Sequence, residues 1–438
     1  KPNTSGQNDT RNNWNPAKKN DDGLQVRGVW TDRSGGMFSN AMRLPSNPAN
    51  TAVLRWNNSL LALCEGGPPI QIDKDTLETI GVYKFPGLGS EDFFSAHPKV
   101  DVRERPGERV LYNHGVVLGP VNKLRVLKAS EAVGVENQIE LNIGDVHFIH
   151  DFAMSEHHLV FILNPYSVNM AGLGVSVAGL KPIGSMFEWR GDSRGARVIV
   201  IRKKDLAVEA DFETKALSFD HMVNAYQSPS NPNRIHVLVL LHDELDESNS
   251  RTLLEQQRSD MYNANFTSAV LPKLWEVEID LSRVSSNVGG ERRKKEDDDH
   301  IRFKQLSGME IELPRVRMDT IGTKNRFVYA NALAAIDGVK PKFLNAVGKI
   351  DLDTQQEQLR HFGYNRFAGE PVFVPKRNAQ SEDDGYLLTY VYDANTHRSE
   401  VVVLDAQDLA AESIATVKLA YHVPHSFHGE FISWDKPG

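Results

Sequence analysis

The sequence predicts an all-β protein, and three observations point to this class. Short apolar segments of the length of a β-strand recur along the chain, mostly bounded by Gly, Pro, Asn or Asp. Long amphipathic helical patterns are scarce. The segments are spread over 438 residues, which is more than one sandwich accommodates, whereas a propeller limits exposed strand edges by repeating small sheets around an axis. We therefore expect an all-β propeller, although no blade repeat is legible.

The predicted strands begin with a hairpin. Val53–Trp56 and Leu60–Leu63 flank Asn57-Asn58, two residues that tolerate a positive φ. The other predicted strands follow in this order: Val110–Tyr112, Leu159–Leu163, Val198–Ile201, Ile235–Leu241, Leu274–Ile279, Phe327–Tyr329, Tyr386–Tyr392 and Val401–Leu404.

The composition excludes several classes of partner and of site. With 40% apolar and 25% charged side chains, the chain can bury a sizeable core. Its net charge of −8 lacks the basic balance that nucleic acid binding normally needs, so we expect no nucleic acid partner. The single cysteine, Cys64, excludes an internal disulfide framework and a cysteine-rich metal site. Any site chemistry is therefore expected to rest on His, Asp and Glu.

The apolar pattern bears on membranes in two ways. No apolar run is long enough for a transmembrane helix, and the polar stretch Lys1–Gly23 contains no apolar core of a signal peptide. One segment, Asn164–Phe187, is Gly-rich and apolar with hardly any charge. We expect it either to form a buried lid or to contact a membrane. The chain is thus expected to be soluble or peripherally membrane-associated.

Four of the fifteen histidines stand in unusual local contexts. They are His97 in Ser-Ala-His-Pro-Lys, His150 in Phe-Ile-His-Asp-Phe, His221 in His-x-x-Asn-Ala-Tyr and His428 in Phe-His-Gly. Their spacing is too wide for a local metal motif, but it suits ligands that different blades of a ring deliver to a central axis. Imidazole binds Fe, Zn, Cu and Ni alike, so four histidines do not name the metal.

These contexts belong to a longer ordered set of motifs, through which the chain resembles the carotenoid cleavage oxygenase family. The resemblance runs from about Asn47 to the C-terminus, whereas residues 1–46 match poorly, with only Ser34–Met37 faintly similar. Besides the histidine segments, the matching motifs are Asn50-Thr51 with Leu61–Gly67, Thr76–Thr79, Ser155-Glu156, Glu312–Arg315, Gly369–Pro375 and Glu382–Gly385.

The resemblance implies a single domain over residues 1–438, folded as a seven-bladed β-propeller with a helical and loop dome over an axial metal site. It makes four histidines the ligands of one Fe(II), namely His97, His150, His221 and His428. It also places three glutamates, Glu65, Glu312 and Glu370, behind the last three of these histidines, in a pairing that the sequence does not settle. Such carboxylates would accept the outer ring N–H and offset the metal charge. His147 competes with His150 as a ligand, but the His-Asp-Phe context favours His150.

The implied activity is that of a non-haem Fe(II) dioxygenase, in which O₂ cleaves a conjugated double bond of a carotenoid or apocarotenoid into two carbonyl products. Alternatives are a stilbene-cleaving dioxygenase, a retinoid-type isomerase that consumes no O₂, and a metal-containing propeller that only binds an apolar ligand. The stilbene-cleaving branch typically carries a lysine immediately before the first glutamate, where this chain has Cys64, so we expect a polyene substrate. A cytoplasmic or plastid-like compartment is expected.

Overall fold

The computed structural model describes residues 47–433, apart from residues 90–91, 146, 169–186, 192, 243–270, 285–297 and 426. Two expectations concern stretches outside this description. Residues 1–46, for which we expected a poor match, lie outside it entirely, and most of Asn164–Phe187 does as well.

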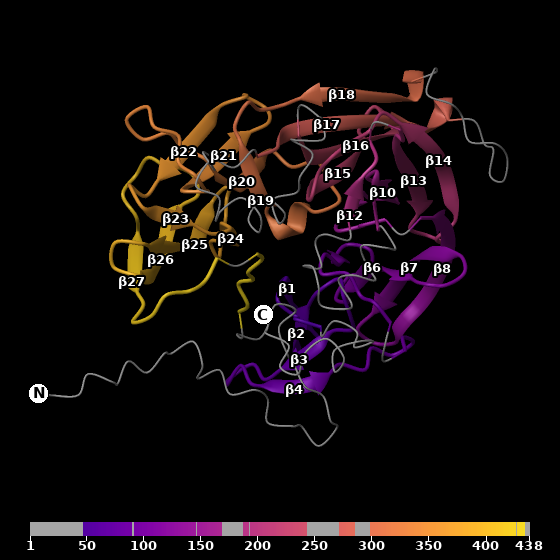
Figure 1. Ribbon diagram of the computed structural model, residues 1–438, viewed down its shortest axis with the longest axis horizontal. Helices are drawn as coiled ribbons and strands as arrows, with labels where there is room; N and C mark the ends of the chain where they lie inside the picture. The colour runs from indigo at the N-terminus through magenta and orange to yellow at the C-terminus, as the bar shows by residue number, and fades with distance from the viewer. Residues whose placement is uncertain are drawn as a thin grey trace, which may run out of the picture.

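The described residues form six antiparallel sheets of four or five strands, numbered here in chain order, and Figure 1 shows them arranged around a central axis. Sheet 1 contains β1 (Ala52–Trp56), β2 (Ser59–Leu63), β3 (Ile70–Ile72) and β4 (Thr79–Val82). Sheet 2 contains β5 (Lys99–Asp101), β6 (Val110–Val117), β7 (Asn122–Ser130) and β8 (Gly134–Gly144). Sheet 3 contains β9 (Ala153–Met154), β10 (His158–Leu163), β13 (Ala196–Arg202) and β14 (Val208–Thr214), with the separate pair β11 (Tyr166–Val168) and β12 (Phe187–Trp189) inserted.

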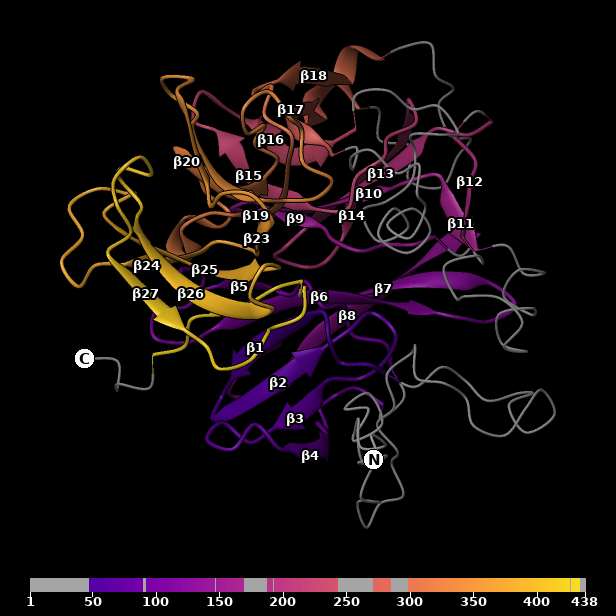
Figure 2. The ribbon, with the colours of Figure 1, turned by 60° about the vertical axis from the view of Figure 1, so that its left-hand side comes forward.

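The second half of the chain forms the other three sheets. Sheet 4 contains β15 (Met222–Ser228), β16 (Asn231–Leu241), β17 (Lys273–Asp280) and β18 (Ile301–Gln305). Sheet 5 contains β19 (Ile311–Arg315), β20 (Phe327–Ala332), β21 (Ala346–Asp351) and β22 (Glu357–His361). Sheet 6 contains β23 (Arg366–Ala368), β24 (Val372–Pro375), β25 (Gly385–Asp393), β26 (Arg398–Asp405) and β27 (Ala415–Lys418). Figure 2 shows the same sheets from the side.

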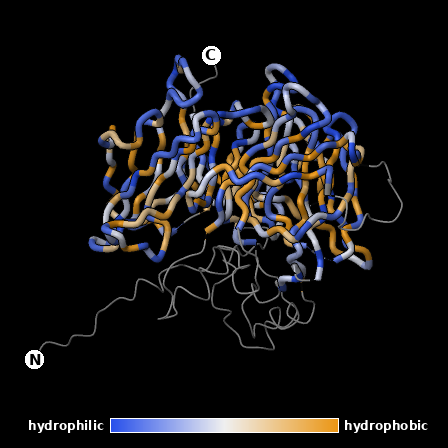
Figure 3. The backbone as a smooth tube through the Cα atoms, turned by 90° about the horizontal axis from the view of Figure 1, so that it is seen from above, coloured by the Kyte–Doolittle hydropathy of each residue, from blue (hydrophilic) through white to orange (hydrophobic). Residues whose placement is uncertain are grey.

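All the predicted strands are confirmed, because each lies within or on a strand of these sheets. The predicted hairpin is β1–β2, in which Trp56 pairs with Ser59 and Asn57 has a φ of 52°. The strand pattern was readable locally because the strands alternate buried and exposed positions or are buried throughout. Figure 3 shows hydrophobic stretches concentrated inside the body and hydrophilic ones on many of the loops.

The expected number of seven blades is wrong for the described residues, which form six. Five apolar clusters fill the interfaces between consecutive sheets, from sheets 1 and 2 to sheets 5 and 6. Among the residues that the structure describes, no such cluster joins sheet 6 to sheet 1. The C-terminal segment returns to sheet 1 instead: the His428 amide donates to the Thr51 carbonyl at 3.0 Å, and Arg55 Nη1 donates to the Ser433 carbonyl at 3.2 Å.

The expected dome of helices is not seen in the described part of the chain. Its helices are three single 3₁₀ turns, at Leu281–Arg283, Asp298–His300 and Met318–Thr320. Accordingly, none of the helices described has the length and apolarity needed to span a lipid bilayer.

Candidate metal centre

Four imidazole rings from four parts of the chain meet on the propeller axis. His97, His150 and His221 each stand just before the first strand of their sheet, β5, β9 and β15, whereas His428 lies on the segment after β27. Their ligand atoms all lie within 4.8 Å of one another. The Nε2 atoms are separated by 3.0 Å from His97 to His150, by 3.2 Å from His150 to His221 and by 3.1 Å from His221 to His428.

Three of the rings have a carboxylate behind them, and the structure gives their pairing. Nδ1 of His150 lies 2.8 Å from Oε1 of Glu65. Nδ1 of His221 lies 2.6 Å from Oε2 of Glu312, and Nδ1 of His428 lies 2.7 Å from Oε1 of Glu370. Glu312 and Glu370 accept the Nδ1 protons of their rings, and Glu65 lies within ion-pair distance of Nδ1 of His150, so these contacts turn the Nε2 atoms of the three rings toward the axis.

This arrangement fits a metal ion. Lone pairs of neutral imidazoles repel one another at such short separations, and a cation between them would satisfy all four. Nitrogens bound at about 2.1 Å to one ion would lie about 3.0 Å apart at right angles and about 3.4 Å apart in a tetrahedron. The three Nε2 separations of 3.0 to 3.2 Å fall within this range, so the rings fit a single ion. His97, His150, His221 and His428 are the residues that could hold the ion.

The electrostatics differ between the rings of the metal-free protein: the surroundings of His97 favour a neutral ring, whereas Glu312 favours a proton on His221, which a bound metal ion would displace. Burial and the neighbouring imidazoles hold the pKa of His97 well below its usual range, so His97 is neutral, as a metal ligand must be. Burial also opposes protonation of His221, but Glu312 raises the pKa of this ring to about 9, which reflects a strong charge-assisted hydrogen bond. Burial opposes ionisation of Glu370, yet Arg315 and His428 bring its pKa down to about 2.

The structure also places Arg315, for which we predicted no role from the sequence, against the third glutamate. Its Nε lies 2.9 Å from Oε1 of Glu370, and its Nη2 donates both to Oε2 of Glu370 and to the Gly429 carbonyl. The Gly429 amide in turn donates to Glu370 at 2.8 Å. Arg315 thus ties the segment that carries His428, which belongs to no strand, to sheets 5 and 6. The signal in the sequence that could have identified Arg315 as part of the site is its position in the Glu-Leu-Pro-Arg motif.

His147, the competing candidate ligand, lies outside the histidine cluster. Its Nδ1 lies 3.0 Å from the Asn164 carbonyl, and the residue forms an isolated bridge with Ser167. The structure brings His150 to the axis instead.

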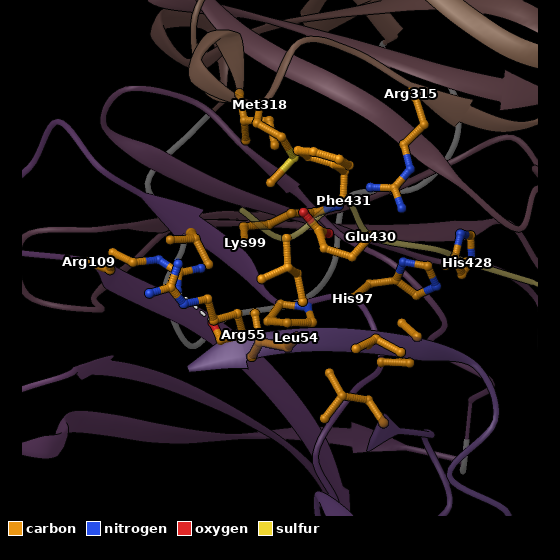
Figure 4. Close-up of a pocket in the computed structure, with 18 of the residues that line it drawn as sticks. Leu54, Arg55, His97, Lys99, Arg109, Arg315, Met318, His428, Glu430 and Phe431 are labelled. Atoms are coloured by element: carbon orange, nitrogen blue, oxygen red, sulfur yellow. Dashed lines mark hydrogen bonds between the residues drawn. The ribbon is translucent and has the colours of Figure 1, made fainter. Parts of the chain in front are cut away.

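A cavity of about 800 Å³ extends from three of the histidines, His97, His221 and His428, along the inner strands. Figure 4 shows His97 and His428 on one side of this cavity and Arg55 and Arg109 on the other, with Lys99 and Glu430 between them. Its wall mixes such charged groups with apolar ones from β1, β5 and β15. The histidine cluster is therefore accessible to small molecules through the interior of the propeller.

Replacing a glutamate behind a ligand by glutamine should weaken metal binding by about 10- to 100-fold, because partners of metal ligands commonly contribute this much. The loss should be larger for Glu312→Gln and Glu370→Gln than for Glu65→Gln, since these side chains are 1%, 3% and 22% exposed. This loss of metal affinity is measured by titrating the metal-free variants with metal in the presence of a competing chelator. Wild-type affinity in all three variants would show that these acids do not support the metal.

The chain is similar to several known proteins along most of its length. A family model described as retinal pigment epithelial membrane protein matches residues 11–433, a range that includes all seven predicted site residues. The apocarotenoid-15,15'-oxygenase of Synechocystis sp. is 31% identical over 418 residues, covering 93% of this chain and 77% of that protein. The chloroplastic 9-cis-epoxycarotenoid dioxygenase of Arabidopsis thaliana is 28% identical over 391 residues, covering 88% of this chain and 59% of that protein.

A solved structure extends the similarity to three dimensions. The crystal structure of cobalt-substituted apocarotenoid oxygenase from Synechocystis superposes with a TM-score of 0.77 at 29% identity, covering 92% of this chain and 79% of that one. The propeller architecture is thus shared along most of both chains.

Proposed function

Because the chain belongs to the retinal pigment epithelial membrane protein family, which is that of the carotenoid cleavage oxygenases, we propose that it is a non-haem Fe(II) dioxygenase acting on a carotenoid or apocarotenoid. The reaction adds both atoms of O₂ across one conjugated double bond. The carbon–carbon and oxygen–oxygen bonds break and two carbonyl groups form. No proton is gained or lost, so the chain needs no acid or base at the reacting carbons.

The observation that carries this proposal is the set of four imidazoles with carboxylates behind three of them. When bound, iron supplies the redox chemistry that allows O₂ to react with an alkene. The four rings would hold the ion, and the cavity beside three of them would admit O₂ and substrate. The chain's own part is to hold the rings in place, to enclose the reacting bond and to limit which bond reaches the site.

Cys64 supports a polyene in preference to a phenolic stilbene. Burial raises the pKa of the Cys64 thiol, so this side chain is neutral next to Glu65. A neutral thiol is a weak donor and offers no positive charge to a phenol oxygen. The anchor that a lysine would supply is therefore replaced by a small group of low polarity.

Contact with a membrane also remains part of this proposal. The apolar segment Asn164–Phe187 would suit a surface that takes up water-insoluble polyenes from a lipid layer. A cytoplasmic or plastid-like compartment stays a prediction, and the chloroplastic name of a plant relative is consistent with the second of these.

The proposal is tested by metal analysis followed by incubation with ¹⁸O₂. We expect about one iron per chain, consumption of O₂ with an apocarotenal or carotenoid in detergent micelles, and one labelled oxygen in each of the two carbonyl products. Rapid quenching limits exchange of the label with water. Turnover of a retinyl ester without consumption of O₂ would identify an isomerase instead, and binding of polyenes without any conversion would identify a binding protein.

A further inference from the structure

His97 differs from the other three rings in how it is held. Within the described residues no carboxylate forms an ion pair with His97, whereas His150, His221 and His428 each have one. A ligand without such a partner lacks the contact that normally fixes the orientation of an imidazole. Another part of the chain must therefore position this ring.

The segment that carries His97 is held two residues further along by a buried ion pair. Nζ of Lys99 lies 2.7 Å from Oδ1 of Asp151, and the two side chains are 16% and 2% exposed. Asp151 directly follows His150, so the pair joins the His97 segment to the His150 segment. The other carboxylate oxygen of Asp151, Oδ2, accepts a hydrogen bond from the Met222 amide at 2.9 Å, and Met222 directly follows His221.

The link between His97 and Lys99 is short and stiff. Pro98 stands between them, so its φ is fixed by the ring and the backbone of His97 is restricted as well. A second tie runs through Ser95, whose Oγ accepts the His97 amide at 3.1 Å and donates to the His150 carbonyl at 3.3 Å. A shift of the Lys99 ammonium is therefore passed on to the His97 ring.

We infer that Lys99 and Asp151 are positioning residues that set His97 against His150 and His221. Glu65, Glu312 and Glu370 orient their rings by direct contact, whereas Lys99 and Asp151 orient the His97 ring by holding the chain segment that carries it. This inference rests on the proposed metal site, because it concerns where the His97 nitrogen is presented to the ion. One carboxylate, that of Asp151, connects three of the four ligand segments, and its burial makes the geometry rigid.

The test uses Co(II) as a spectroscopic probe in the full metal-free chain, with affinity measured against a chelator. Lys99→Met should lower the Co(II) affinity about 10-fold and change the visible absorption bands, because the His97 nitrogen moves. Lys99→Arg keeps the cation, so this variant should retain most of the Co(II) affinity and nearly the wild-type absorption bands. In a His97→Ala background, titrated up to Co(II) concentrations that saturate the weaker three-histidine site, Lys99→Met should cause no further loss of affinity, since the ring on which it acts is absent. Asp151→Asn, which keeps an acceptor for the Met222 amide, should behave in the same way as Lys99→Met.

The matched control is Lys203→Met. This substitution breaks another buried Lys–Asp pair, Lys203 with Asp101 at 2.5 Å, whose members touch no histidine of the cluster. It should lower thermal stability but leave the Co(II) affinity and bands unchanged.

Two results would overturn the inference. One is wild-type affinity and bands in both Lys99→Met and Asp151→Asn; the other is an equal loss with and without His97. These results are distinct from failure of the proposed function, which would appear as a wild-type chain that binds no metal. If the chain binds metal but cleaves no polyene, the positioning role is still decided by the same titration.

Discussion

Replacing His221 by alanine should remove nearly all bound iron and abolish polyene cleavage, and the same should hold for His97, His150 and His428. The loss in metal affinity should exceed about 100-fold, because removal of a mere partner of a ligand already costs about 10- to 100-fold. In His221→Ala the change also leaves the carboxylate of Glu312, which is 1% exposed, without the ring that neutralises it. Metal content and O₂ consumption of each purified variant measure the effect.

His236→Ala is the matched control for these variants. His236 is also a histidine beside glutamates, with Nδ1 3.4 Å from Oε2 of Glu276, but it lies on β16 and outside the cluster. This variant should keep its iron and its activity. Full iron content and full activity in His150→Ala would show that the four rings do not form the metal site.

The second large effect concerns the substrate. We expect turnover of a long apolar polyene, a carotenoid or apocarotenoid, in preference to hydroxylated stilbenes. The position before Glu65 is occupied by Cys64, which is neutral because burial raises its pKa. A phenol or phenolate has no cationic partner there, and burying such a polar group without a partner costs about 1–3 kcal/mol, or roughly a factor of 5 to 150 in binding.

Side-by-side incubation with carotenoids, apocarotenals and hydroxystilbenes in detergent micelles measures this discrimination. The variant Cys64→Lys serves as the complementary test, because it introduces the ammonium group that a phenol oxygen would meet. It should raise stilbene binding relative to the wild type while the histidine cluster keeps its metal. Efficient stilbene cleavage by the wild type, without polyene turnover, would contradict the argument from Cys64.

The strands were predictable because their signal is local. A segment such as Leu159–Leu163 or Ile235–Leu241 reveals a strand by its own apolar run, and both are strands in the structure. The hairpin around Asn57 is equally local, since two neighbouring residues determine the turn. Membership of the family was also evident from short motifs and is confirmed by the comparison along residues 11–433.

The number of blades and the partners of each ring were not local properties. Seven blades were expected from the resemblance, but a blade count depends on which sheet faces pack together, and the described residues provide five such interfaces for six sheets. The pairing of Glu312 with His221 joins residues from sheets 4 and 5. Spacing along the chain carries no information about such contacts.

The sequence by itself therefore determined the strands, the family and the histidines that meet on the axis, because each of these is marked by short stretches of residues. Only the tertiary structure decided which glutamate stands behind which ring and how His97 is held. Asp151 illustrates the reason: its two oxygens contact Lys99 and the Met222 amide, which belong to two other sheets. These groups come together only after the blades have packed, so the connection between the ligand segments is a property of the folded ring.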